Sequence, residues 1–382
     1  MIVGRGKLFA SVPSKWKPRS LKWDVLDSKV DWKPILDFMK PKYEHIFITH
    51  SMAIGGVETA ILSYLNSFPT KEQSKTCIMS MYDNLAWKLP EKVFYKKINF
   101  DELKDIICPG IKTIWVQPLI GIPDEFVEYA KGLGIKVLYM VVSTVLSLVR
   151  RGKELSPTYY VSTSEQLDDF CKNSDLTPLI SLHHHVADPI YKKKNTGGYR
   201  LGFVGRNSVE KNSHLIPRVL LYLDDKFTIN YFVPDKKAPN GASSLEILNK
   251  TKEITKTMGF ENRVYFNYDI TNPDEIYSNI DILLLPSMFE GYSMVAHEAL
   301  VRGIPVIISD KLALGKENNP GLMEFELNKD RVLDDISVRK MAYAIEQVSE
   351  LDPFEIASQS SEHTLSSYFA SESYKSLLEV LA

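Results

Sequence analysis

The stretch IDILLLPSMFEGYSMVAHEALVRGIPVIISD, residues 280–310, decides the fold that we predict for this chain. It begins with a continuous apolar run that ends at Pro286, which is typical of a parallel strand buried on both faces. A short helical segment follows and ends at Gly303, and residues 304–310 are again apolar. A strand, a helix and a second strand in this order predict a βαβ unit.

The same alternation of short apolar runs and helical segments extends along the chain in two series. With 382 residues the chain is too long for one ordinary core. The sequence therefore predicts an α/β protein with two Rossmann-like, doubly wound parallel-sheet lobes facing across a cleft. We expect the strands within residues 45–52, 75–82, 113–118, 136–143, 159–164 and 179–186, and then within 200–205, 227–234, 264–269, 280–287 and 304–310.

The boundary between the lobes is expected in the polar, turn-rich residues 188–199, which have the composition of a linker. We assign residues 1–189 to the first lobe with an N-terminal arm, and residues 190–363 to the second. Apolar residues recur at helical spacing in 364–382, so we expect an amphipathic helix there that packs back on one of the lobes, with the first favoured.

The composition is that of a globular protein, with 44% hydrophobic and 25% charged residues. A formal net charge of -2 gives no overall attraction to nucleic acid or anionic lipid. The three cysteines (Cys77, Cys108 and Cys171) are odd in number and widely spaced, which favours reduced thiols. Together with the lack of a signal-peptide pattern and of a long apolar run, they predict a cytoplasmic protein.

The first 25 residues carry six basic residues together with Trp16 and Trp23. Such a segment could contact a membrane surface or an anionic acceptor. The alternative is an arm that packs on the body of the protein. The oligomeric state is not predictable from these patterns.

The segment FVGRNSVEKN, residues 203–212, places charged side chains at the end of a predicted buried strand. Ligands of open α/β sheets bind outside the carboxyl ends of the strands. Arg206 brings a planar fork of donors and Lys211 a mobile point charge, a pair suited to a diphosphate. The alternative is a tight turn at Gly205 with two solvated charges.

Two further elements point to the same kind of ligand. Gly55 and Gly56 follow a predicted strand and open a helix, so a ligand could approach the backbone N–H groups closely; a plain strand-to-helix turn is the alternative. Glu290 and Glu298 flank the start of the helix in residues 280–310. Carboxylates accept paired hydrogen bonds from neighbouring hydroxyls, as in a ribose or a sugar ring, which suits a nucleotide sugar.

These residues carry a resemblance to a known family. The segment from Glu290 to Glu298 resembles the E-x7-E signature of retaining glycosyltransferases of family four, which have the GT-B fold. Arg206 and Lys211 match the diphosphate-binding arginine and lysine of that family. The resemblance covers about residues 45 to 350, and it is specific in the second lobe and loose in the first.

The resemblance implies transfer of a sugar, with retention of configuration, from a nucleotide diphosphate sugar to a hydroxyl of a saccharide, glycolipid or polysaccharide precursor. It implies that Glu290 lies against the donor sugar and that Glu298 binds the ribose. As catalytic residues we expect Glu290, Arg206 and Lys211. As donor-binding residues we expect Gly55, Gly56, Gly205, Arg206, Lys211, Gly291, Tyr292, Ser293 and Glu298.

Two positions depart from the family pattern. Ser143 or Thr144 stands where many members carry a histidine near the reacting carbon, and His185 replaces the glycine of the hinge motif that ends at Asp188. Two alternatives therefore stay open. One is a phage-type enzyme acting on modified DNA bases, with basic residues 150–153 on the phosphate backbone. The other is a catalytically silent binding protein with the same fold.

No metal and no other cofactor is expected, because the chain has no Asp-x-Asp motif to hold a metal-bound diphosphate. The run His183–His185 suggests a metal site at first sight. Neighbouring residues of a strand point to opposite faces, so only His183 and His185 would share a side. We expect these histidines to line the region between the lobes instead.

Overall fold

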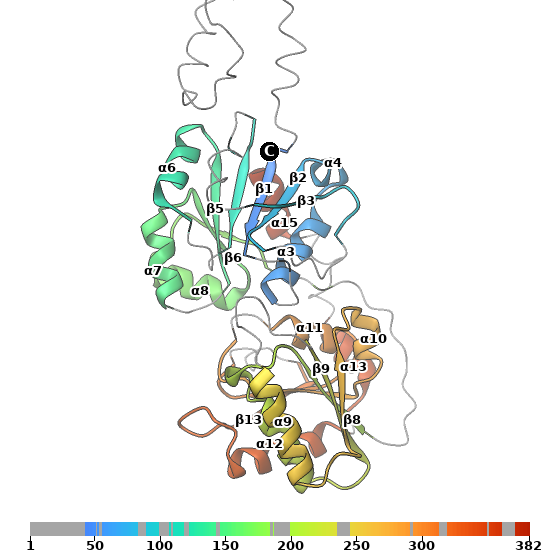
Figure 1. Cartoon of the computed structure of the whole chain (residues 1–382). Helices are drawn as coiled ribbons and strands as arrows, with labels where there is room; N and C mark the ends of the chain where they lie inside the picture. The colour runs from blue at the N-terminus through green and yellow to red at the C-terminus, as the bar shows by residue number, and fades with distance from the viewer. Residues whose placement is uncertain are drawn as a thin grey trace, which may run out of the picture.

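The computed structural model describes residues 43–50, 52, 56–82, 89–98, 107, 110–117, 122–142, 146–183, 186, 199–234, 245–290, 293–312, 319–349, 351–360 and 371–382. These residues form two α/β lobes, each built on one parallel sheet (Figure 1). The predicted fold class is confirmed. Among the described residues, no helix combines the length and the apolar character needed to cross a membrane.

The first lobe contains a seven-stranded sheet in the order β3-β2-β1-β4-β5-β6-β7. All of its pairings are parallel, with β1 at the point where the strand order reverses. Successive side chains of each strand point to opposite faces of the sheet, and helices bury both faces. The strands are β1 (His45–Thr49), β2 (Thr76–Ser80), β3 (Phe94–Lys97), β4 (Thr113–Val116), β5 (Lys136–Val141), β6 (Tyr159–Ser162) and β7 (Leu179–Ser181).

Helices cover both faces of the first sheet. One face packs on α6 (Asp124–Gly132), α7 (Leu146–Leu155) and α8 (Glu165–Asn173). The other packs on α3 (Gly56–Ser67) and on the C-terminal helix α15 (Glu372–Leu381), which returns from the second lobe to lie against this sheet (Figure 1). The short helix α4 (Thr70–Gln73) precedes β2.

The second lobe contains a six-stranded parallel sheet in the order β10-β9-β8-β11-β12-β13. Its strands are β8 (Tyr199–Val204), β9 (Phe227–Val233), β10 (Val264–Tyr268), β11 (Ile282–Leu285), β12 (Val306–Ser309) and β13 (Leu322–Phe325). Its helical segments are η3 (Val209–Lys211), η4 (Ser213–Leu221), α9 (Leu245–Thr257), α10 (Pro273–Tyr277), α11 (Met294–Leu300), α12 (Asp335–Val348) and α13 (Pro353–Gln359).

The βαβ unit expected in residues 280–310 is present as β11, α11 and β12. Gly303 follows α11 with a φ of +71°, and its N–H donates to the Leu300 carbonyl at 2.9 Å. A Cβ at this position would lie 2.3 Å from the Pro353 carbonyl oxygen, so both conformation and space require glycine. The helix itself ends at Leu300, three residues before the glycine that the sequence indicates as its end.

Candidate functional site

The candidate site lies where the strand order of the second sheet reverses. Strand β8 pairs with β9 on one side and with β11 on the other. Strand β10 therefore lies beyond β9, and β12 and β13 lie beyond β11. A ligand of an open parallel sheet binds at such a reversal, outside the carboxyl ends of the strands. Arg206 and Lys211 follow β8, and Glu290 follows β11, so all three belong to the loops that flank this point.

Gly205 directs the chain out of β8 toward the site. Its N–H donates to the Phe232 carbonyl of β9 at 3.1 Å, and its φ of +149° is one that glycine adopts readily. The next residue, Arg206, has a half-buried side chain, and its guanidinium lies 3.7 Å from the Glu210 carboxylate. The Ser208 hydroxyl donates to the same carboxylate at 2.6 Å. Arg206 is therefore held at the end of β8 by its own loop.

Lys211 forms an ion pair with Glu290, which joins the loop after β8 to the loop after β11. Both side chains are mostly buried, with 17% and 15% exposed. The Ser287 hydroxyl donates to the same Glu290 oxygen at 3.0 Å. Because the two partners are 79 positions apart in the sequence, only the parallel pairing of the sheet brings them together.

Asn212 joins these loops through hydrogen bonds, a role that no pattern in the sequence indicates. It has a left-handed backbone with φ of +51°, which asparagine tolerates better than most residues. Its fully buried amide donates to the Pro286 carbonyl at 2.8 Å and to the Arg331 carbonyl at 3.0 Å. The Met288 N–H also donates to the Glu210 carbonyl at 2.7 Å. The loops that carry Lys211 and Glu290 are thus cross-linked by hydrogen bonds.

Glu298 has a different set of neighbours. It lies in α11, and the buried Tyr277 hydroxyl of α10 donates to its carboxylate at 2.7 Å. Burial raises the pKa of Glu298, while the hydrogen bond from Tyr277 and the positive charge of Arg302 oppose that rise. The guanidinium of Arg302 also lies 5.1 Å from the centre of the Tyr277 ring. No pattern in the sequence indicates a role for Tyr277, because that role depends on how α10 packs against α11.

The start of α11 is only partly described. Gly291 and Tyr292, both expected to bind the donor, lie outside the described residues. Ser293 precedes the helix without capping it. Its hydroxyl is buried and has no hydrogen-bond partner among the described residues. A ligand group at the end of β11 would supply such a partner.

The first lobe contributes a buried carboxyl group. Gly55 is not among the described residues, but Gly56 is the first residue of α3, and Glu58 lies in its first turn with 8% of its surface exposed. Burial raises the pKa of Glu58 to about 7, against the lowering effects of its own backbone N–H, Arg206 of the second lobe and Gln117.

The remaining predicted positions add little to the candidate site. Ser143, Thr144, His185 and Asp188 fall outside the described residues. His183 lies 2.9 Å from the Asp168 carboxylate, which also accepts a hydrogen bond from Ser162. These contacts hold the end of β7 against α8.

A cluster of possible metal ligands lies at the other end of the first sheet, where Glu44, His45 and Glu72 meet. Lys75 lies 3.0 Å from Glu44 and 3.5 Å from Glu72, and Lys112 lies 3.3 Å from Glu44. Two ammonium groups thus offset the two carboxylates. We interpret the cluster as a structural ion-pair network at the amino end of β1.

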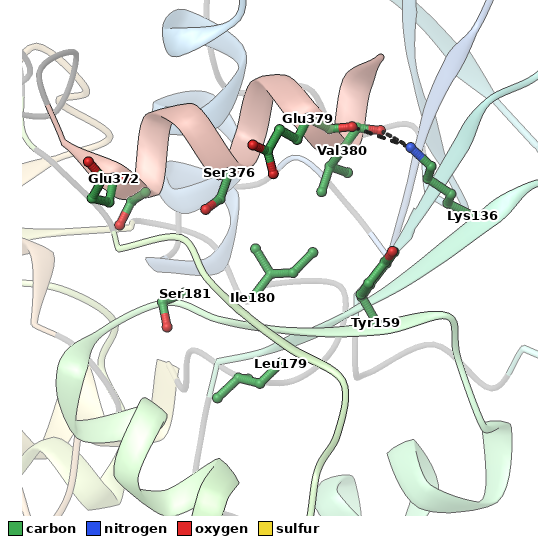
Figure 2. Close-up of a pocket in the computed structure, with 10 residues that line it drawn as sticks. Lys136, Tyr159, Leu179, Ile180, Ser181, Glu372, Ser376, Glu379 and Val380 are labelled. Carbon is green, nitrogen blue, oxygen red and sulfur yellow. Dashed lines mark hydrogen bonds between the residues drawn. The ribbon is translucent and has the colours of Figure 1, made fainter.

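A cavity of about 420 Å³ lies between α15 and strands β5, β6 and β7. Lys136 and Tyr159 line it from the first residues of β5 and β6, and Lys136 donates to the Val380 carbonyl at the end of α15 at 3.1 Å (Figure 2). It therefore lies against the first residues of β5 and β6 and along the whole of β7. The cavity is separate from the candidate site.

Comparison with solved structures defines the class of fold. The structure of HepE from Anabaena with UDP-glucose superposes with a TM-score of 0.69 and 11% identity, over 88% of this chain and 99% of that chain. Sucrose-phosphate synthase from Thermosynechococcus elongatus gives 0.66 and 13%, over 88% and 98%. At such identities these likenesses show the fold alone, and the fold is GT-B.

Comparison with protein families places the chain more closely. Residues 191–325, which lie in the second lobe, match the family model "Glycosyl transferases group 1". The match lies in the lobe that carries Arg206, Lys211, Glu290 and Glu298. The resemblance seen in the sequence is confirmed.

Curated relatives match over shorter stretches. Mannosylfructose-phosphate synthase of Agrobacterium fabrum is 35% identical over 65 residues, which is 16% of this chain and 14% of that protein. The O-antigen biosynthesis glycosyltransferase WclY of Escherichia coli is 32% identical over 95 residues, 25% of each. Protein CapJ of Staphylococcus aureus is 21% identical over 225 residues, 56% of this chain and 50% of CapJ. This chain thus spans from a seventh to a half of the length of these relatives.

Proposed function

We propose that this protein transfers a sugar from a nucleotide diphosphate sugar to an acceptor hydroxyl, with retention at the anomeric carbon. The observation that carries the proposal is the arrangement of Arg206 and of the Lys211–Glu290 ion pair at the strand-order reversal of the second sheet. The solved structures of HepE with UDP and with UDP-glucose support a nucleotide-sugar donor.

The two cations have a direct role in this reaction. When the bond between the anomeric carbon and the diphosphate breaks, negative charge grows on the leaving phosphate. Arg206 and Lys211 stabilise that charge because they are fixed in place before the reaction begins. Lys211 is already paired with Glu290, so its position costs no rearrangement when the donor binds.

The two glutamates have different surroundings and so different roles. Glu290 is mostly buried beside Lys211 and Ser287, where it orients the donor sugar and supports positive charge near the anomeric carbon. We assign it no covalent bond to the sugar. Glu298 is held by Tyr277 and accepts hydrogen bonds from the ribose.

For the acceptor we propose a saccharide or glycolipid, such as a precursor of a cell-surface polysaccharide. The names of two similar proteins support this choice: WclY acts in O-antigen biosynthesis, and WaaB is a lipopolysaccharide outer core galactosyltransferase. A DNA acceptor is less well supported. Arg151 of the basic segment lies 2.7 Å from Asp124 and 3.5 Å from Glu154, so its charge is already engaged within the lobe.

The test is a donor screen followed by product analysis. The protein is incubated with nucleotide diphosphate sugars, beginning with UDP-glucose, and release of the nucleotide diphosphate is measured with and without saccharide acceptors. We expect acceptor-dependent release and a product whose proton NMR coupling shows the configuration of the donor. An inverted product would contradict retention, and no release with any donor would contradict the proposed activity.

A matched pair of variants links the activity to the site. Lys211→Ala should lower turnover by about a hundredfold to a thousandfold, as removal of one stabilising contact to a developing oxyanion does. Lys340 forms a similar ion pair with Glu326 in the same lobe but is 45% exposed, so Lys340→Ala should leave turnover unchanged. Equal effects of the two changes would remove Lys211 from the mechanism.

A further inference from the structure

Two buried nitrogen atoms lie without a partner where the strand order of the first sheet reverses. Strand β1 pairs with β2 on one side and with β4 on the other. His50 directly follows β1, and Gln117 directly follows β4. The His50 Nδ1 and the Gln117 Nε2 are buried and have no hydrogen-bond partner among the described residues. Buried polar groups are normally paired, so this pair of atoms calls for an explanation.

The rest of the lobe does not share this feature. In the described part of the first lobe, His50 and Gln117 are the residues that leave a buried side-chain nitrogen or oxygen without a partner. The ring of His45 and the hydroxyl of Tyr160, for example, form hydrogen bonds at 3.0 Å and 3.1 Å. The unpaired atoms therefore coincide with the edge at which an open parallel sheet binds its ligand.

Gln117 is held in one orientation. Its amide oxygen accepts hydrogen bonds from the Thr49 hydroxyl at 2.6 Å and from the His50 N–H at 2.8 Å. A backbone N–H can only donate, so the atom that it contacts must be the oxygen, and the amide nitrogen faces the other way. Because Gln117 is only 1% exposed, that nitrogen is a fixed, buried donor that needs an acceptor atom.

His50 lies beside an exposed aromatic ring. The centres of the His50 and Tyr82 rings are 4.6 Å apart, with 45° between the ring planes. The Tyr82 N–H donates to the His50 carbonyl at 3.1 Å, and the Ser80 hydroxyl donates to the Tyr82 carbonyl at 2.7 Å. These hydrogen bonds join the segments that follow β1 and β2. Tyr82 itself is 47% exposed, which leaves part of its ring open to a ligand.

These groups suit a neutral compound that is rich in hydroxyls. The Gln117 nitrogen requires an oxygen acceptor, and burial lowers the pKa of His50, which keeps its ring neutral and able to donate or accept. The hydrogen-bond and ring partners of both residues are uncharged. An anionic ligand would find no opposite charge on these partners, whereas a hydroxyl both donates and accepts. The aromatic ring of Tyr82 suits the apolar C–H face of a sugar.

We propose that this site binds the saccharide acceptor: Gln117 Nε2 donates to one hydroxyl oxygen, His50 Nδ1 pairs with a neighbouring hydroxyl, and Tyr82 packs against the sugar ring. The inference rests on the proposed function, which places the donor on Arg206 and Lys211 and assigns no residue to the acceptor. A bound saccharide gives both buried nitrogens a partner. Gln117 thereby selects an acceptor with an oxygen at one position of the ring.

The experiment measures sugar transfer from the donor to the methyl glycosides of glucose, galactose and mannose. Gln117→Glu keeps an oxygen for the hydrogen bonds from Thr49 and His50 but replaces the donor nitrogen by a second oxygen. We expect it to raise the acceptor KM about tenfold, with little change in the donor KM. The control is Tyr160→Phe, which removes a buried hydroxyl bonded to the Gly152 carbonyl and should leave both KM values unchanged.

Monodeoxy derivatives of the best glycoside test for direct contact. Removing the hydroxyl that Gln117 binds should raise the acceptor KM of the wild type about tenfold, and Gln117→Glu should raise it no further with that derivative. A purely structural role of Gln117 would instead add the same loss for every derivative. That result would overturn the inference, and so would an equal rise of the donor KM.

The outcomes separate the inference from the proposed function. Donor hydrolysis without transfer to any of the glycosides, and without their binding in saturation-transfer NMR, would overturn the inference and leave the donor site intact. No turnover of any donor would contradict the proposed function, while NMR binding of a glycoside that Gln117→Glu weakens would still support the saccharide site. If Gln117→Glu does not fold, the deoxy series on the wild type decides. A series in which no single hydroxyl matters would overturn the inference.

Discussion

The burial of Glu58 makes a quantitative prediction about stability that needs no substrate. Its pKa is about 7 in the folded chain against an ordinary value of 4.5. Between these values the folded state binds more protons than the unfolded state, so stability falls as the pH rises from about 4.5 to about 7, and the loss is complete above that. At about 1.4 kcal/mol for each pH unit, the full loss is about 3 kcal/mol.

Glu58→Gln should remove this loss, because glutamine keeps the size of the side chain but carries no ionisable proton. At pH 8 we expect the first lobe of the variant to be more stable than the wild type by up to about 3 kcal/mol. Near pH 4.5 the advantage should vanish. If the ionised carboxylate stabilised the lobe, Glu58→Gln would be less stable than the wild type at pH 8.

Urea unfolding followed by tryptophan fluorescence measures this difference. All five tryptophans precede residue 116, so none lies in the second lobe, and Trp115 is fully buried in the first. Glu128→Gln is the control, since its side chain is 65% exposed in the same lobe, and its difference from the wild type should not change with pH. A Glu58→Gln variant that is destabilised equally at pH 5 and pH 8 would refute the reasoning.

Three further predictions concern the donor site. Tyr277→Phe should raise the donor KM about tenfold, because it removes the hydrogen bond to Glu298 and a hydrogen bond to a charged group contributes about 1.5 to 3 kcal/mol. The control is Tyr231→Phe, which removes a buried hydroxyl that donates to a backbone carbonyl and should leave KM unchanged. Glu290→Ala should lower kcat more than donor affinity, and Glu298→Ala should lower donor affinity more than kcat. Steady-state kinetics with the donor concentration varied measure both quantities, and the opposite pattern would contradict the assigned roles. Excess EDTA should leave the rate unchanged, because fixed cations meet the diphosphate charge; a loss that magnesium or manganese restores would contradict this.

The strands of both sheets were predictable where burial makes the sequence apolar. The run that becomes β11 is fully buried, and so is the run that becomes β1. Strand β3 was missed because it lies at the edge of the sheet and ends in two exposed lysines. Strand β13 was also missed, since this edge strand is only partly buried and contains an exposed glutamate. Edge strands need fewer apolar residues and so leave a weaker pattern.

The loops that carry the candidate site could be placed from the sequence, because parallel strands all end at the same edge of their sheet. Which side chains meet at that edge could not be predicted from the sequence. The sequence does not show that Lys211 pairs with Glu290 while Glu298 pairs with Tyr277. Side chains from separate loops meet only after strand order and helix packing are set.

The sequence by itself determined the two-lobed α/β architecture and the polar loops at the ends of β8 and β11. These features are local, because apolar runs, glycines and charges repeat at spacings that the backbone geometry imposes. Only the tertiary structure decided that Lys211 after β8 pairs with Glu290 after β11, and that the Glu58 carboxyl is buried. Burial and long-range electrostatics depend on which elements lie side by side, and this is set by packing over the whole chain rather than by any stretch of it.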